Sequence, residues 1–141
     1  MDHIVYVDAK ENDLEKLLNG KKTMIVRGAA GRKLPFGRVE AGDHLYFTLN
    51  NGEGLLRACA PVLQVENLGP LSEELANKIL DQHQAQLNLA PAQRKRWQGK
   101  RFLVLISIGV AQPLDAFPFD RSGYGNMDDW LPVGNILSVK R

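Results

Sequence analysis

Short apolar runs along the chain predict a domain built mainly of β-strands. The runs are rich in Val, Ile, Tyr and Phe, and turn-forming residues separate most of them. The predicted strands lie at residues 4–7, 22–27, 45–49, 55–66, 102–108 and 136–139. In the second strand, alternation places Thr23, Ile25 and Arg27 on one face. The run at 102–108 is the most apolar and is predicted to be central, and Pro61 is expected to mark an edge or a bulge.

Helical spacing and capping signals predict three helices between these strands. They are expected at about residues 11–19, 72–86 and 91–98. Asp13 is the predicted cap of the first helix, and Gly20 is expected to end it. In the second helix, Leu75, Ile79 and His83 recur at the spacing of one buried stripe.

Two segments without such patterns are predicted to be loops. Residues 28–37 hold three glycines, a proline and two basic residues, which is typical of a mobile loop. Residues 116–133 are rich in aromatic residues, glycine and proline. The order of the elements contains no repeat, linker or low-complexity tract. It predicts a single α+β domain over residues 1–141, a small barrel of about six strands with short helices at its rim.

Composition agrees with one globular domain that folds in a reducing compartment. The 141 residues are 44% hydrophobic and 24% charged, an ordinary globular balance. A lone cysteine, Cys59, excludes an internal disulfide or a cysteine-based zinc site, and its apolar neighbours predict a buried position. No secretion signal and no membrane-length apolar run are recognised, so we expect a cytoplasmic location and no membrane partner.

Positive charge is concentrated in two parts of the chain, although the net charge is only +2. The first acid-free segment contains Lys21, Lys22, Arg27, Arg32, Lys33 and Arg38, and the second contains Arg94, Lys95, Arg96, Lys100 and Arg101. If the fold brings both segments to one face, that face attracts phosphate in a salt-sensitive manner. The alternative is two separate solvated surfaces.

The segment 17–27, LLNGKKTMIVR, resembles the hallmark of the ASCH family within the PUA-like superfamily. In that family a helix ends in glycine, a Lys-Thr pair follows, and an arginine lies on the next strand. The Gly42-Asp43 turn and the late segment from Phe117 to Trp130 are similar to further landmarks of such domains. The resemblance implies a PUA-like pseudo-β-barrel with a cleft, in a family linked to RNA or modified-nucleotide binding.

Several side chains could serve such a cleft. Lys22 and Arg27 are expected to reach it and to bind phosphate, the lysine as a point charge and the arginine through two parallel hydrogen bonds. Base stacking would fall to Tyr124 and Trp130. Two competing interpretations stand beside these roles: Trp130 as a core residue, and Arg27 paired with Asp43 across the sheet. The predicted nucleic-acid-binding residues are Lys21, Lys22, Arg27, Arg32, Lys33, Arg38, Tyr124 and Trp130.

Some compact ASCH proteins are amidohydrolases that act on acylated cytidine-type nucleosides, and the resemblance shows how far their machinery is present. Their lysine matches Lys22, but the position of their nucleophilic threonine is occupied by Ile25, which has no hydroxyl. Thr23 lies nearby on the same predicted strand face. We therefore expect a binding domain for RNA or a nucleotide rather than an enzyme.

The acidic residue of that machinery would fall within 72–83, where Glu73, Glu74 and Asp81 are present. The two glutamates are equally suited to the start of a helix, where the dipole favours carboxylates. Catalytic residues of such an enzyme would be Lys22, Thr23, Glu73 and Glu74. A ribonuclease or a protein-interaction module would also be consistent with the chain. The three histidines are scattered along the sequence, so neither a metal site nor a cofactor is expected.

Overall fold

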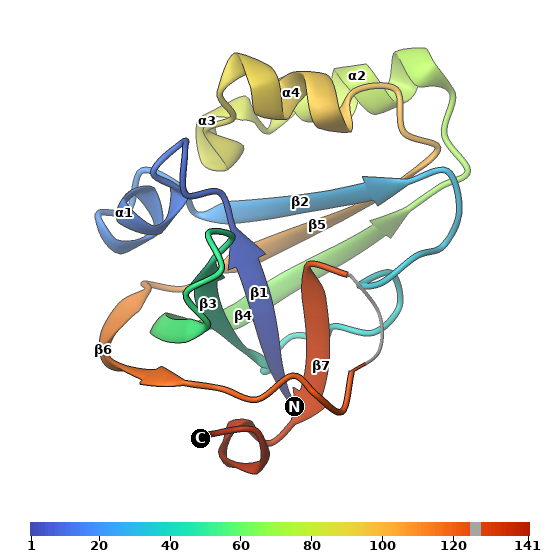
Figure 1. Ribbon diagram of the computed structural model, residues 1–141. Helices are drawn as coiled ribbons and strands as arrows, with labels where there is room; N and C mark the ends of the chain where they lie inside the picture. Colours follow the sequence, from blue (N-terminus) through green and yellow to red (C-terminus); the bar gives the residue numbers. More distant parts are fainter. Residues whose placement is uncertain (125–127) are drawn as a thin grey trace.

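The computed structural model describes residues 1–124 and 128–141 as a strongly bent mixed β-sheet with helices packed on part of it (Figure 1). The strands are β1 (Asp2–Val7), β2 (Met24–Ala29), β3 (His44–Leu49), β4 (Leu55–Leu68), β5 (Phe102–Ile108), β6 (Gln112–Pro118) and β7 (Trp130–Gly134). They are ordered β2-β5-β4-β3-β1-β7, and β6 pairs with β4. The β1–β3 pair is parallel, whereas the other pairs are antiparallel.

The bend comes from β4, which is 14 residues long and belongs to both halves of the sheet. Its first part pairs with β3 and β6, and its second part pairs with β5. The register with β5 shifts between Val62 and Gln64, directly after Pro61, which confirms the predicted irregularity at this proline.

The sheet is open at one seam. No strand pairing joins the two edge strands, β2 and β7, within the described part of the chain. The predicted six-strand barrel is therefore corrected to a seven-strand mixed sheet that is not closed by backbone hydrogen bonds. The single-domain prediction for residues 1–141 remains a prediction, although one sheet contains strands from both ends of the described chain.

Helices cover β2 and β5 on one face of the sheet (Figure 1). They are α2 (Glu73–Gln82), α3 (Gln84–Leu87) and α4 (Pro91–Trp97), while α1 (Asp13–Leu18) follows β1. Ala76 and Leu80 of α2 are buried, whereas Leu75 is 45% exposed. The predicted buried stripe of Leu75, Ile79 and His83 is therefore wrong: the face that packs on the sheet is the one that begins one residue later, with Ala76 and Leu80. None of the helices described in residues 1–124 and 128–141 is long and apolar enough to span a membrane.

The main core fills the inside of the bend. Val5, Phe47, Ile106 and Trp130 from four different strands are buried in it. A second core, with Val26 and Leu105, lies between the sheet and the helices. Cys59, predicted to be buried, is only half-buried, because strand alternation turns its buried neighbours Ala58 and Ala60 to the other face.

The C-terminal third differs most from the sequence-based expectation. The predicted loop 116–133 overlaps the end of β6 and most of β7, and the predicted last strand, 136–139, is instead the 3₁₀ helix η1 (Ile136–Ser138). β6 carries two prolines and is mostly exposed, which an edge strand tolerates. Asn135 ends β-structure here, since its side chain accepts a hydrogen bond from the Leu137 amide and starts η1.

Candidate functional site

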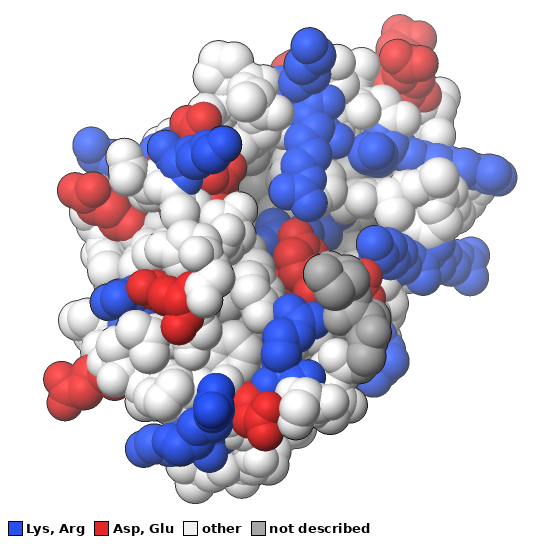
Figure 2. All heavy atoms as spheres, viewed as in Figure 1, with Lys and Arg blue, Asp and Glu red and all other residues white. Residues whose placement is uncertain are grey.

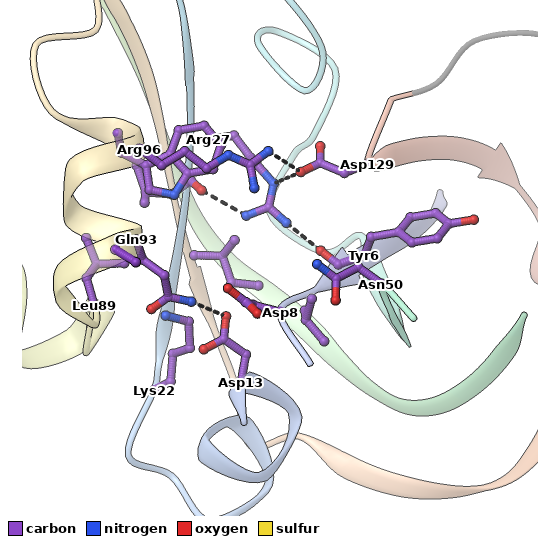
Figure 3. A pocket seen from close by; sticks show the side chains of 15 residues that line it. Tyr6, Asp8, Asp13, Lys22, Arg27, Asn50, Leu89, Gln93, Arg96 and Asp129 are labelled. Atoms are coloured by element: carbon purple, nitrogen blue, oxygen red, sulfur yellow. Dashed lines mark hydrogen bonds and ion pairs between the residues drawn. The ribbon is translucent and has the colours of Figure 1, made fainter. Parts of the chain in front are cut away.

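A pocket of about 230 Å³ lies at the open seam of the sheet, between the end of β1, α1, β2 and α4 (Figure 3). Its volume is below the roughly 300–1,000 Å³ of sites for drug-sized ligands. It therefore suits a small group or one unit of a larger ligand. The pocket is lined by Tyr6, Val7, Asp8, Asp13, Lys22, Ile25, Val26, Arg27, Asn50, Leu89, Ala92, Gln93, Arg96, Trp97 and Asp129.

Lys22 lies on one wall of this pocket, in the connection between α1 and β2. The side chain is 5% exposed, and its ammonium donates a hydrogen bond to the Leu87 carbonyl at the end of α3. Burial lowers the pKa of Lys22 to about 8, although the nearby Asp13 carboxylate partly opposes this shift. Because an ammonium has three donor hydrogens, the bond to Leu87 leaves two for other partners.

Asp13 provides a buried acceptor beside Lys22. Its predicted capping role is wrong: Asn12 is the cap position, and Asp13 is the first residue of α1, with its side chain in the pocket. One carboxylate oxygen, Oδ2, accepts a hydrogen bond of 2.9 Å from Gln93 Nε2. The other, Oδ1, is buried and has no hydrogen-bond partner. An unpaired buried acceptor costs about 1–3 kcal/mol, so a hydrogen-bond donor that reached this oxygen would be favoured.

Gln93 has a fixed orientation on α4. Its Oε1 accepts a hydrogen bond from the Ala90 amide at 2.9 Å, so its amide nitrogen must face Asp13. This arrangement joins α4 to the start of α1 across 80 residues of sequence. Sequence reasoning missed both residues as site candidates, because Asp13 alone resembled a helix cap and Gln93 carried no motif.

Arg27 connects the two sides of the open seam. Its guanidinium nitrogens donate to the carbonyl oxygens of Val26 on β2, at 2.9 Å, and Tyr6 on β1, at 2.8 Å. Its Nε lies 3.2 Å from Asp129 Oδ2, just before β7. Asp129 is held in turn by its carbonyl, which accepts the Tyr6 amide at 3.0 Å. Arg27 thus links β1, β2 and Asp129 where strand pairing is missing, and backbone carbonyls use two of its five N–H donors.

The alternative partner for Arg27, Asp43, has other contacts. Its carboxylate lies 2.8 Å from His3 Nε2 and 3.3 Å from the N-terminal amine. His3 is buried and accepts the indole N–H of Trp130 at 3.0 Å through Nδ1. This chain of contacts supports the main core and lies outside the lining of the pocket.

Arg96 and Trp97 form the outer wall of the pocket. The Arg96 guanidinium lies 4.5 Å from the centre of the Trp97 ring and 3.6 Å from Asp129. Its side chain is 62% exposed, so one planar face rests near the indole while the group remains open to solvent. Trp97 itself is largely buried. An exposed guanidinium plane can stack on a nucleobase.

The pocket is not basic as a whole. Three cations line it, Lys22, Arg27 and Arg96, and they are balanced by three carboxylates, Asp8, Asp13 and Asp129. The sequence-based hypothesis of a basic cleft took no account of the acids, because all three lie outside the two acid-free segments.

Of the other predicted basic residues, only Lys33 reaches a hollow near this pocket. It lies 3.2 Å from Asp128 and lines two neighbouring hollows. Lys21 and Arg38 are exposed and line none of these spaces. Arg32 lies over the rings of Phe36 and Phe102, at 5.7 and 5.8 Å. The loop 28–37, predicted to be mobile, is packed against β5 through Phe36.

The predicted stacking residues lie apart from the pocket. Trp130 is 0% exposed and has no ring face open to a base, in agreement with the alternative that it belongs to the core. Tyr124 packs on the separate hydrophobic cluster around Ile4 and Leu131, on another side of the sheet.

The residues predicted for an amidohydrolase are dispersed in the same way. Thr23 is exposed, and its hydrogen bond with Gln86 joins backbone atoms only. Glu73 and Glu74 are exposed in the first turn of α2 and do not line the pocket. Ile25 lines the pocket, as Lys22 does. The described lining contains no serine, threonine or cysteine. Among the described residues, no cluster of three or more potential ligands could hold a metal ion.

The bent mixed sheet with helices on one face is a fold similar to that of an ASCH domain protein. The structure is similar to the crystal structure of ASCH from Zymomonas mobilis, with a TM-score of 0.70 and 12% identity over 99% of this chain and 96% of that chain. A crystal structure of a ZmASCH mutant from the same organism gives a TM-score of 0.71 and 11% identity over 99% of both chains. No family model and no curated protein sequence matches the chain. The resemblance seen in residues 17–27 is thereby confirmed for the fold.

Proposed function

We propose that this protein binds RNA or a nucleotide, and that the pocket at the seam receives one base. The observation that carries this proposal is that a charge-balanced pocket is lined both by Lys22, whose ammonium has donor hydrogens left, and by Asp13, whose Oδ1 has no partner. A nucleobase edge presents donors and acceptors next to each other and carries no charge, so it matches such a pair. A phosphate there would meet as many carboxylates as cations, so the pocket offers it no net attraction.

The surroundings of the pocket support the same ligand class. The exposed guanidinium of Arg96 offers a flat face for stacking at the mouth. Figure 2 shows Lys and Arg side chains on either side of the hollow between the helices and the sheet, with carboxylates inside it. The ASCH-like fold adds weight, because the family resemblance implies RNA or modified-nucleotide binding.

Fluorescence anisotropy with a labelled 12-nucleotide single-stranded RNA tests the proposal. Replacing Lys22 with methionine removes a charged donor and should weaken binding by about 10–100-fold, since hydrogen bonds to charged groups contribute about 1.5–3 kcal/mol. The matched control is Lys78→Met on the exposed side of α2, which changes the net charge equally and should leave the affinity nearly unchanged.

Asp13→Asn separates base recognition from general electrostatics. Gln93 must still find an acceptor, so the new amide would turn its oxygen to Gln93, and its nitrogen would take the place of Oδ1. An acceptor becomes a donor at constant size, and binding should weaken although a negative charge has been removed. Tighter RNA binding by this variant, or equal losses in Lys22→Met and Lys78→Met, would count against a base in the pocket.

A further inference from the structure

A second hollow, of about 310 Å³, adjoins the pocket at the seam, which we call the base pocket from here on. The two spaces share part of their walls, namely Arg27, Arg96, Trp97 and Asp129. A ligand that fills the first space can therefore continue into the second over the Arg96 side chain. The second hollow is bounded by the end of β2 and by the loop that contains Lys33.

The charge of this second hollow differs from that of the base pocket. Four cations line it, Arg27, Lys33, Arg96 and Lys100, against one carboxylate, Asp129. Arg27 is occupied by the seam, and Lys33 is paired with Asp128. Arg96 is exposed and shares Asp129 at 3.6 Å. Lys100 has no ion pair with a carboxylate of the described chain, so an anion here would meet a cation that is not neutralised.

Gly28 explains why Lys100 lies over this hollow. A Cβ at position 28 would come within 3.1 Å of Lys100 Cγ and 2.8 Å of Leu103 Cδ2. The absence of a side chain on β2 thus lets the aliphatic part of Lys100 lie directly against the strand. The start of the Lys100 side chain is therefore positioned by packing against β2 and not by a carboxylate partner.

We infer that the second hollow holds a phosphate group attached to the nucleotide whose base occupies the first pocket. This inference rests on the proposed function. Phosphate contacts from lysine and arginine fix the position of a nucleic acid, whereas contacts to base edges select it. Here the charge-balanced pocket would contact the base edge, and the adjacent cationic hollow would contact the phosphate. The ligand is therefore a nucleotide or a strand, not a free nucleoside.

Binding measurements with three kinds of probe test this inference: the four ribonucleosides, their 5′- and 3′-monophosphates, and the 12-nucleotide RNA. The wild-type protein should bind monophosphates or RNA about tenfold more tightly than nucleosides, as expected for added charge-assisted hydrogen bonds. Lys100→Gln should weaken the phosphate-bearing probes by up to about fivefold and leave nucleoside binding unchanged. For RNA, the plot of log affinity against log salt concentration should also become less steep, by about the one unit expected for the loss of one phosphate contact.

Lys95→Gln is the matched control, because Lys95 is exposed on α4 and lines neither space. If Lys100→Gln weakens the binding of the monophosphates, the hollow holds a terminal phosphate. If it weakens only the binding of RNA, the hollow holds a phosphodiester of the strand. Both results support the inference. If nucleosides and nucleotides bind equally well and Lys100→Gln behaves like Lys95→Gln, the inference fails while the base pocket stands. If no probe binds to the wild-type protein, the proposed function itself fails.

Discussion

Replacing Arg27 with glutamine tests whether a side chain holds the seam of the sheet together. The change removes the ion pair with Asp129 and at least one of the two hydrogen bonds to the carbonyls of Tyr6 and Val26. Breaking a buried ion pair by removing one partner costs about 3–5 kcal/mol. Asp129 is 34% exposed, which places the expected loss near the lower end, at about 3 kcal/mol.

Urea unfolding followed by circular dichroism measures this loss. For a slope of about 2 kcal/mol/M, the midpoint should fall by roughly 1.5 M. Arg57→Gln is the matched control, since Arg57 pairs with Glu53 on the surface and such pairs contribute at most about 1 kcal/mol. A third variant, Arg27→Lys, keeps the charge but cannot reach both carbonyls, so it should remain destabilised.

Two results would refute this reasoning. The first is a midpoint in Arg27→Gln that falls no further than in Arg57→Gln, which would mean that the seam contacts contribute no more than a surface pair. The second is full recovery in Arg27→Lys, which would show that positive charge alone is needed at this position and that the forked contact to β1 and β2 is not.

Three further predictions concern titration and packing. RNA affinity should fall above pH 8 as Lys22, whose pKa burial lowers to about 8, loses its proton; anisotropy across this range should show no such step in Lys22→Met. Burial also lowers the pKa of His3 below its ordinary 6.5, so the unfolded chain gains a proton that the folded chain does not. Stability should therefore fall as the pH drops below 6.5, and urea titrations of His3→Gln should lack that slope. Gly28→Ala should cost about 1–3 kcal/mol in thermal unfolding, because it displaces Leu103, and it should weaken RNA binding by displacing Lys100; an unchanged midpoint and affinity would contradict this packing.

If one space binds the base and the other binds the phosphate, the carboxylates of the site also have a role. Asp129 fixes Arg27 and contacts Arg96, so it neutralises the boundary between the base pocket and the phosphate hollow. Asp13 faces Lys22 inside the base pocket. Acidic side chains repel a phosphate backbone, so under the proposed function their position would keep phosphate out of the pocket that receives the base.

Local patterns determined much of the fold. The apolar runs at 45–49 and 102–108 correspond to β3 and β5, and the helix signals correspond to α1, α2 and α4. Such predictions succeed because the spacing of apolar residues reflects which side of an element is buried. The segment 17–27 also indicated an ASCH-like fold and placed Lys22 and Arg27 within reach of one pocket, where the structure finds both. Exposed edge strands such as β6 escaped notice, since they bury too little to show a pattern.

Tertiary structure alone decided what those charges meet. Arg27 and Asp129 lie far apart in the sequence, and they meet only because β7 pairs with β1 beside the seam. In the same way, the packing of α4 brings Gln93 to one carboxylate oxygen of Asp13, and the other oxygen stays buried without a partner. Periodicity reports the burial of a residue but carries no information about its partners across the sheet. The sequence by itself therefore indicated where positive charge lies, whereas the balance of charge within the pocket was set by long-range pairing.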